Sequence, residues 1–169
     1  DVYKRQTVWR WRSHSNHMGE RFFVGYPRDG KWHDPEMDIV SAFVDQVPED
    51  DLSRHRRKEH GFTIYPTITE ALRMGTNPLA VDGGLLIAEH GSYPRNEKDQ
   101  KLYPRYEFFE EIVNVFKEDG RSVPVFNDKH LSYEYGKAKQ MVEWSKELDF
   151  PFLAGSSIPV TFRLPPLEL

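Results

Sequence analysis

The chain contains no cysteine among its 169 residues. Disulfides, thiolate metal ligands and a cysteine nucleophile are therefore excluded. The sequence also lacks any apolar run near the roughly 20 residues that a membrane-spanning helix needs, and it shows no signal-peptide pattern. These absences favour a cytoplasmic protein with a small-molecule substrate and no membrane partner.

An excess of positive charge is missing as well. The 23 lysines and arginines are outnumbered by 27 acidic residues, which gives a formal net charge of −4. Proteins that bind nucleic acid usually carry a basic patch or stripe, so we expect no nucleic-acid partner. The hydrophobic content of 38% in a chain of this length predicts one domain with a substantial core.

Both ends of the sequence look unusual. There is no initiating methionine, and residues 1–6 (DVYKRQ) resemble translated adapter sequence from metagenomic contigs. We predict that residues 1–6 are a non-native leader, that 7–163 form a single domain, and that 164–169 are the truncated start of a following segment. The chain is then a fragment, and a homo-oligomer could form through a missing C-terminal domain.

Short β-rich or apolar runs alternate with helical patterns along the chain. Strands are expected within 7–11, 37–44, 62–65, 79–88, 123–126 and 152–154, and helices within 14–24, 50–60, 67–74, 104–120 and 133–148. Residues 27–36, rich in proline and charge, are expected to form a loop. This alternation predicts an α/β fold, a doubly wound and mostly parallel sheet with helices on both faces, of Rossmann-like type.

Four of the expected strands are followed at once by polar side chains. The carboxyl ends of parallel strands meet at one edge of the sheet, where ligands bind. We therefore expect these side chains to form one composite site rather than separate patches. The residues are Arg10, Arg12, Ser13 and His14 after the first strand, Asp45 after the second, Glu89 and His90 after the central strand, and Asp128, Lys129 and His130 after the fifth.

The turn after the first strand has no glycine before Gly19, whereas a dinucleotide-binding turn normally carries several. Two arginines and a helix N-terminus could still hold a phosphate or a carboxylate. An acid at the position of Asp45 commonly accepts hydrogen bonds from ribose hydroxyls, although aspartate also favours turns. These positions could equally be solvated turn residues.

The two later clusters contain groups suited to proton transfer. Glu89 and His90 could act in general acid–base chemistry. Lys129, beside Asp128 and His130, suits proton abstraction or polarisation of a carbonyl group. The alternative interpretation of the second cluster is an ion-paired loop.

The chain resembles the nucleotide-binding domain of the glucose–fructose oxidoreductase, inositol dehydrogenase and MocA (Gfo/Idh/MocA) family over residues 7–155. Asp45 lies where that family has its ribose-binding acid, and Asn127-Asp128-Lys129-His130 resembles its Glu-Lys-Pro motif, with Lys129 at the functional lysine. The chain also resembles a set of uncharacterised bacterial proteins. The first resemblance implies NAD or NADP as cofactor and a substrate-binding domain beyond this sequence.

Three hypotheses follow. In the first, the protein is an NAD(P)-dependent oxidoreductase acting on a sugar or polyol. Lys129, His130, Glu89, His90 and Asp128 then form the catalytic group, and Arg10, Arg12, Ser13, His14 and Asp45 face the cofactor. In the second, a divalent metal serves a hydrolase or lyase. Imidazole and carboxylate groups suit such an ion, and the ligands would come from His14, His17, Glu89, His90, Asp128 and His130. In the third, the chain is a non-catalytic ligand-binding module, as the missing glycines suggest.

Overall fold

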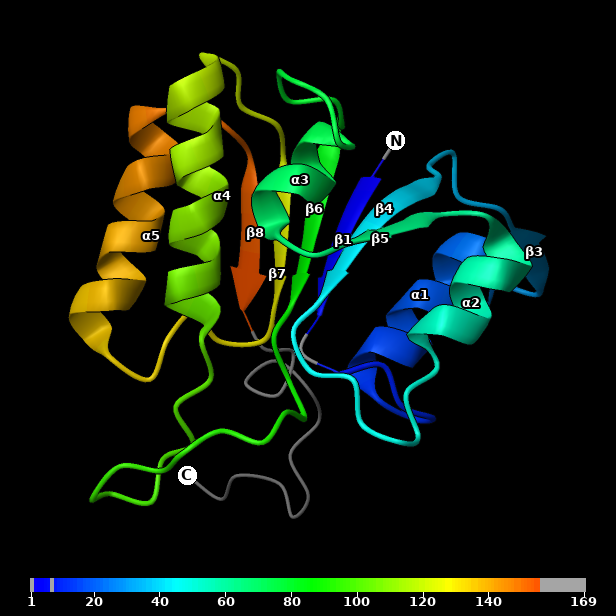
Figure 1. Ribbon diagram of the computed structural model, residues 1–169, viewed down its shortest axis with the longest axis horizontal. Coiled ribbons are helices and arrows are strands. Elements are labelled where there is room, and N and C mark those ends of the chain that lie inside the picture. The colour runs from blue at the N-terminus through cyan, green and yellow to red at the C-terminus, as the bar shows by residue number, and fades with distance from the viewer. Residues whose placement is uncertain (1, 7, 156–169) are drawn as a thin grey trace.

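The computed structural model describes residues 2–6 and 8–155. Its centre is a six-stranded sheet in which every strand pair is parallel, as the alternating pattern predicted (Figure 1). The strand order is β5-β4-β1-β6-β7-β8. The strands are β1 (Val2–Gln6), β4 (Ile39–Val44), β5 (Thr63–Tyr65), β6 (Gly83–Ile87), β7 (Val125–Asp128) and β8 (Phe152–Gly155).

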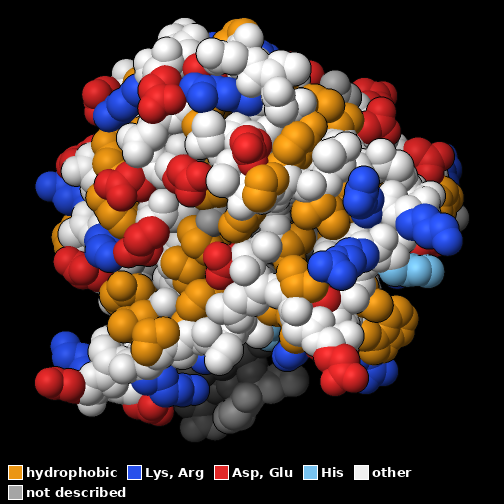
Figure 2. All heavy atoms as spheres, viewed as in Figure 1, with side chains coloured by type: hydrophobic (Ala, Val, Ile, Leu, Met, Phe, Trp, Pro, Cys, Tyr) orange, Lys and Arg blue, Asp and Glu red, His pale blue; other side chains and the backbone are white. Residues whose placement is uncertain are grey.

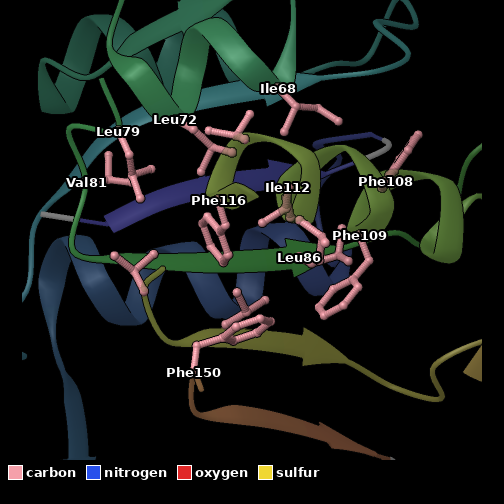
Figure 3. Close-up of a cluster of buried hydrophobic side chains, with 14 of the residues drawn as sticks. Ile68, Leu72, Leu79, Val81, Leu86, Phe108, Phe109, Ile112, Phe116 and Phe150 are labelled. Carbon is pink, nitrogen blue, oxygen red and sulfur yellow. The ribbon is translucent and has the colours of Figure 1, made fainter. Parts of the chain in front are cut away.

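Five helices pack on the two faces of this sheet. They are α1 (His14–Val24), α2 (Ser53–His60), α3 (Ile68–Arg73), α4 (Arg105–Asp119) and α5 (Tyr135–Glu147). The larger core lies under α3 and α4, and Figure 3 shows Phe109, Ile112 and Phe116 of α4 pointing towards β6, with α1 on the opposite side of the sheet. The predicted doubly wound α/β fold with helices on both faces is confirmed.

Local sequence signals set the helix boundaries. Ser13 is the N-cap of α1, and its hydroxyl oxygen accepts a hydrogen bond from Asn16 N at 3.2 Å. Thr67 caps α3 in the same way, with its hydroxyl accepting from Glu70 N at 3.1 Å. Gly61 ends α2 in a left-handed conformation (φ 80°), which glycine adopts without a steric penalty. All three boundaries agree with the sequence prediction.

The position of the first strand was predicted wrongly. The strand is Val2–Gln6, not the run 7–11, so residues 2–6 belong to the sheet. Trp9 is fully buried and packs against both Phe23 and Phe62, at ring-centroid distances of 6.0 and 5.6 Å. Its carbonyl oxygen accepts a hydrogen bond from Leu52 N at 2.6 Å, outside the sheet. The β-rich composition of the run reflects this aromatic packing.

The stretch expected to be a loop contains a small hairpin, so that prediction was also wrong. Strands β2 (Tyr26–Arg28) and β3 (Lys31–His33) pair antiparallel. Asp29 and Gly30 between them have φ values of 50° and 72°. Positive φ at both central residues is the requirement of a type I′ turn, and Asp-Gly is a preferred sequence for it.

The order of the strands places a topological switch point between β1 and β6, because the chain moves outward to β4 and β5 on one side and then to β6 on the other. Figure 2 shows acidic and basic side chains interspersed over the visible face. No helix in the described residues is long and apolar enough to cross a membrane. The predicted segment 164–169 lies outside the described residues, and the non-native origin of residues 1–6 stays a prediction.

Candidate functional site

The ends of β6 and β7 and the start of α1 bring four predicted site residues together. His14 Nδ1 lies 2.8 Å from Asp128 Oδ2, although 114 residues separate the two in sequence. The rings of His14 and His90 are tilted by 53° to each other, with centroids 5.5 Å apart. His90 Nε2 is 3.7 Å from Glu89 Oε2. We call these four residues, His14, Glu89, His90 and Asp128, the strand-end cluster; the structure brings them together at one edge of the sheet, and their role as a site stays a prediction.

Arg105 joins this cluster and was missed by the sequence analysis. It is the first residue of α4, is only 1% exposed, and donates to Glu89 Oε1 at 2.8 Å. Its guanidinium carbon also lies 4.8 Å from the centroid of the Tyr103 ring. The helical spacing could have indicated its burial. Arg105 lies three and four residues before Phe108 and Phe109, so all three share the buried face of the helix.

The protonation of His130 follows from its partner. A guanidinium group only donates hydrogen bonds, so the contact of 3.1 Å between Arg105 Nη1 and His130 Nε2 makes that nitrogen an acceptor. His130 is then neutral, with its proton on Nδ1. Partial burial lowers the pKa of His130, and the positive charge of Arg105 lowers it further. Burial is also the main cause that lowers the pKa of His90, against the opposing effect of Glu89.

The backbone of the loop after β7 is held by a buried amide. Asn127 is fully buried, and its Nδ2 donates to the carbonyl oxygens of Asp128, Lys129 and His130 at 3.3–3.4 Å. Lys129 has a φ of 71° and forms an isolated antiparallel β-bridge with Gly155 at the end of β8. His90 and Arg12 also adopt left-handed conformations, with φ 64° and 61°. Such conformations are uncommon for residues other than glycine, and they concentrate at functional sites.

A polar pocket of about 480 Å³ opens beside the strand-end cluster. It lies at the switch point, because its lining comes from the segments that follow β1, β4 and β6. Gln46 and Ser92 fasten two of these segments together: Ser92 N donates to Gln46 Oε1 at 2.8 Å, and Gln46 Nε2 donates to the Ser92 carbonyl at 3.1 Å. The lining residues are Val8, Arg10, Gln46, Val47, Pro48, His90, Gly91, Ser92 and Lys101.

The residues predicted to face a cofactor are not all gathered in this pocket. Arg10 lines it and is paired with Asp50, Nε to Oδ1, at 2.8 Å. Ser13 serves as the helix cap, and Arg12 is exposed. Asp45 is exposed at the end of β4, and its Oδ2 accepts a hydrogen bond from Tyr93 OH at 2.6 Å. Among the proposed metal ligands, His17 is exposed and lies outside the group formed by His14, Glu89 and His90.

Solved structures of several dehydrogenases and of a reductase are similar in fold to this chain. Apo scyllo-inositol dehydrogenase from Lactobacillus casei superposes with a TM-score of 0.59 and 11% identity, over 91% of this chain and 36% of that one. GenD2 from gentamicin A biosynthesis, in complex with NAD, superposes with a TM-score of 0.58 and 15% identity, over 91% of this chain and 34% of GenD2. Biliverdin reductase from Synechocystis sp. PCC 6803, in complex with biliverdin and NADP+, superposes with a TM-score of 0.56 and 14% identity, over 90% of this chain and 36% of the reductase.

These identities show the fold alone, and the chain spans about a third of the length of each of these proteins. No protein-family model and no curated protein sequence matches the chain. The resemblance inferred from the strand-end motifs is therefore supported by the structure of a diverged Rossmann-like domain, the kind found in Gfo/Idh/MocA-type dehydrogenases.

Proposed function

We propose that the protein is an NAD(P)-dependent oxidoreductase that acts on a sugar or polyol and binds its cofactor in the strand-end pocket. One observation carries the proposal: the polar pocket of about 480 Å³ lies at the switch point of a doubly wound sheet, lined from the ends of β1, β4 and β6. Open α/β sheets bind ligands at this position. The NAD and NADP+ complexes among the similar structures support the same cofactor class.

The donor groups of the pocket fit a phosphorylated nucleotide. Arg10 and Lys101 both line it, and their positive charges suit a pyrophosphate. These side chains take the place of the glycine-rich turn, whose backbone N–H groups hold the pyrophosphate in other dinucleotide-binding domains. Asp45 lies at the end of β4, where an acid accepts the ribose hydroxyls. A carboxylate has about four acceptor positions, so the hydrogen bond from Tyr93 leaves capacity for a ribose.

The catalytic roles divide between two neighbouring residues. A nicotinamide cofactor, when bound, supplies the oxidation–reduction chemistry. Oxidation of a hydroxyl also requires that a base remove its proton, and we assign this role to Lys129. His130 cannot use Nε2 for that purpose while Arg105 donates to it, but its Nδ1–H can donate a hydrogen bond to the substrate oxygen. Glu89 and His90 line the approach, and Asp128 holds the His14 ring in place.

A turnover assay tests this assignment. The full chain is incubated with NAD+ or NADP+ and a panel of sugars and polyols, and reduced cofactor is followed by absorbance. We expect turnover with at least one member, its loss in Lys129→Ala, and full retention in Lys139→Ala. Lys139 is an exposed lysine of α5 that pairs with Glu143 at the surface and serves as the matched control. Equal turnover in wild type and Lys129→Ala would contradict the role of Lys129.

A further inference from the structure

We propose that His14, Glu89 and His90 form a binding site for a divalent transition-metal ion, of the Zn²⁺ class. One ligand atom from each of the three residues lies within 4.8 Å of the other two. Within residues 2–6 and 8–155, no other group of three or more such side chains meets this condition. Two imidazoles with one carboxylate are a donor set suited to Zn²⁺ and to Fe²⁺.

The contact between Glu89 and His90 supports an ion between them. Glu89 Oε2 and His90 Nε2 are 3.7 Å apart, which is too long for a hydrogen bond. Two ligands on one tetrahedral Zn²⁺, each about 2.0–2.1 Å from the metal, are separated by about 3.3 Å. The observed spacing of 3.7 Å is somewhat longer than this separation, so a small movement of one side chain would bring both groups onto one ion. His90 has a side chain that is 45% exposed, so it has room to rotate and close the remaining gap.

The ligand side chains are held in place by a second layer of charged groups. Asp128, which is 9% exposed, contacts His14 Nδ1 at 2.8 Å and so leaves Nε2 of that ring available for a metal. A carboxylate on the far nitrogen is the usual partner of a metal-binding histidine, because it fixes the ring and raises its basicity. Arg105 occupies one oxygen of Glu89 at 2.8 Å and so fixes the orientation of the other.

The backbone around the ligands and their charged neighbours is also constrained. His90 is held at φ 64°, and the buried Asn127 anchors the loop that follows Asp128. Three protein ligands leave at least one coordination position for water or a substrate oxygen, so the ion would act as a Lewis acid at the edge of the polar pocket. This inference does not rest on the proposed cofactor, because every ligand is positioned by the fold itself.

Titration with Co²⁺, a spectroscopic substitute for Zn²⁺, tests the site. Full chain purified without a histidine tag is stripped with EDTA and titrated while the visible spectrum is recorded. We expect one equivalent of Co²⁺ to produce the absorption bands of a low-coordinate site, and Zn²⁺ to displace it. His90→Ala should weaken binding at least tenfold, and Asp128→Asn should weaken it about 10–100-fold.

His17→Ala provides the matched control, because His17 is an exposed histidine one turn from His14 on the same helix. It should bind Co²⁺ as wild type does. His90 is exposed, so its replacement leaves the fold intact, as circular dichroism would verify. Binding by wild type that is no tighter than by His90→Ala, or a loss in His17→Ala as large as in His90→Ala, would overturn the proposal. Neither result depends on NAD(P) binding, so this site and the oxidoreductase function can fail separately.

Discussion

Arg105 and Glu89 form a buried ion pair that links the first turn of α4 to the segment after β6, with Arg105 Nη2 donating to Glu89 Oε1 at 2.8 Å. Arg105 is 1% exposed and the Glu89 side chain is 14% exposed. Burying two charges is costly unless they are paired and hydrogen-bonded. The pair therefore fixes the position of a strand-end carboxylate that both proposals use, and it makes that position sensitive to the loss of either partner.

Replacing Arg105 with methionine should destabilise the protein by about 3–5 kcal/mol, because the largely buried carboxylate of Glu89 would lose its ion pair with Arg105. Urea unfolding followed by circular dichroism measures the change. Arg95→Met is the control: Arg95 is an exposed arginine that pairs with Asp99 at 3.0 Å in the surface loop, and its loss should change stability by less than about 1 kcal/mol. Equal stability of the two variants would show that the buried pair is unimportant.

A methyl group at Gly91 should disturb the pocket. An added Cβ would lie 2.3 Å from the Tyr93 ring, whose hydroxyl donates to Asp45. We expect Gly91→Ala to displace that ring and to lower the free energy of unfolding by roughly 1–3 kcal/mol. Thermal unfolding measures the change. Gly136→Ala is the comparison, because the nearest atom to its Cβ is 3.6 Å away at the start of α5. Gly136→Ala should raise the free energy of unfolding by about 0.4–1 kcal/mol. A change in stability of the same sign in both variants would refute the packing argument.

Stability should fall as the pH drops below about 6.5, the ordinary pKa of histidine. The folded pKa of His130 is lowered by burial and by Arg105, while Glu89 opposes and Lys129 adds to this effect. The unfolded chain therefore binds a proton more readily than the folded one. The contribution of neutral His130 is fully present above the unfolded pKa and is lost as the pH falls towards the folded value.

Melting temperatures at about pH 7.5 and about pH 5.5 measure this effect. His130→Gln keeps a neutral polar group near Arg105 and cannot titrate, so the decrease between the two pH values should be smaller in the variant than in wild type. A decrease of the same size in both proteins would assign the pH dependence to other groups.

The sheet edge was predictable because its evidence was topological. Alternating strands and helices required parallel strands, and parallel strands required that Glu89, His90 and Asp128 end at the same edge. The sequence reasoning placed His14 and Asp128 at the same edge, and the structure adds the contact between them. Arg105 was missed because it belongs to none of the polar groups that follow the strands, although the period of α4 buries it.

The errors in the fold have similar physical causes. Trp9 and its neighbours have strand-like composition, but aromatic stacking against Phe23 and Phe62 places them beyond the strand. The hairpin β2–β3 was hidden by its prolines and charges, although Asp29-Gly30 carried a specific turn signal. The fate of individual polar side chains was harder to predict, since Arg10 is paired with Asp50 and Asp45 is already bonded to Tyr93.

The most direct test of the central claim is a fluorescence titration of NADH and NADPH against the protein. The account predicts saturable binding of at least one cofactor that weakens about tenfold or more in Asp45→Ala and in Lys101→Ala, because these residues face the ribose and the phosphates. Lys139→Ala should bind as wild type does. Absence of binding at millimolar cofactor, or affinity unchanged by both Asp45→Ala and Lys101→Ala, would contradict the claim that this pocket holds a nicotinamide dinucleotide.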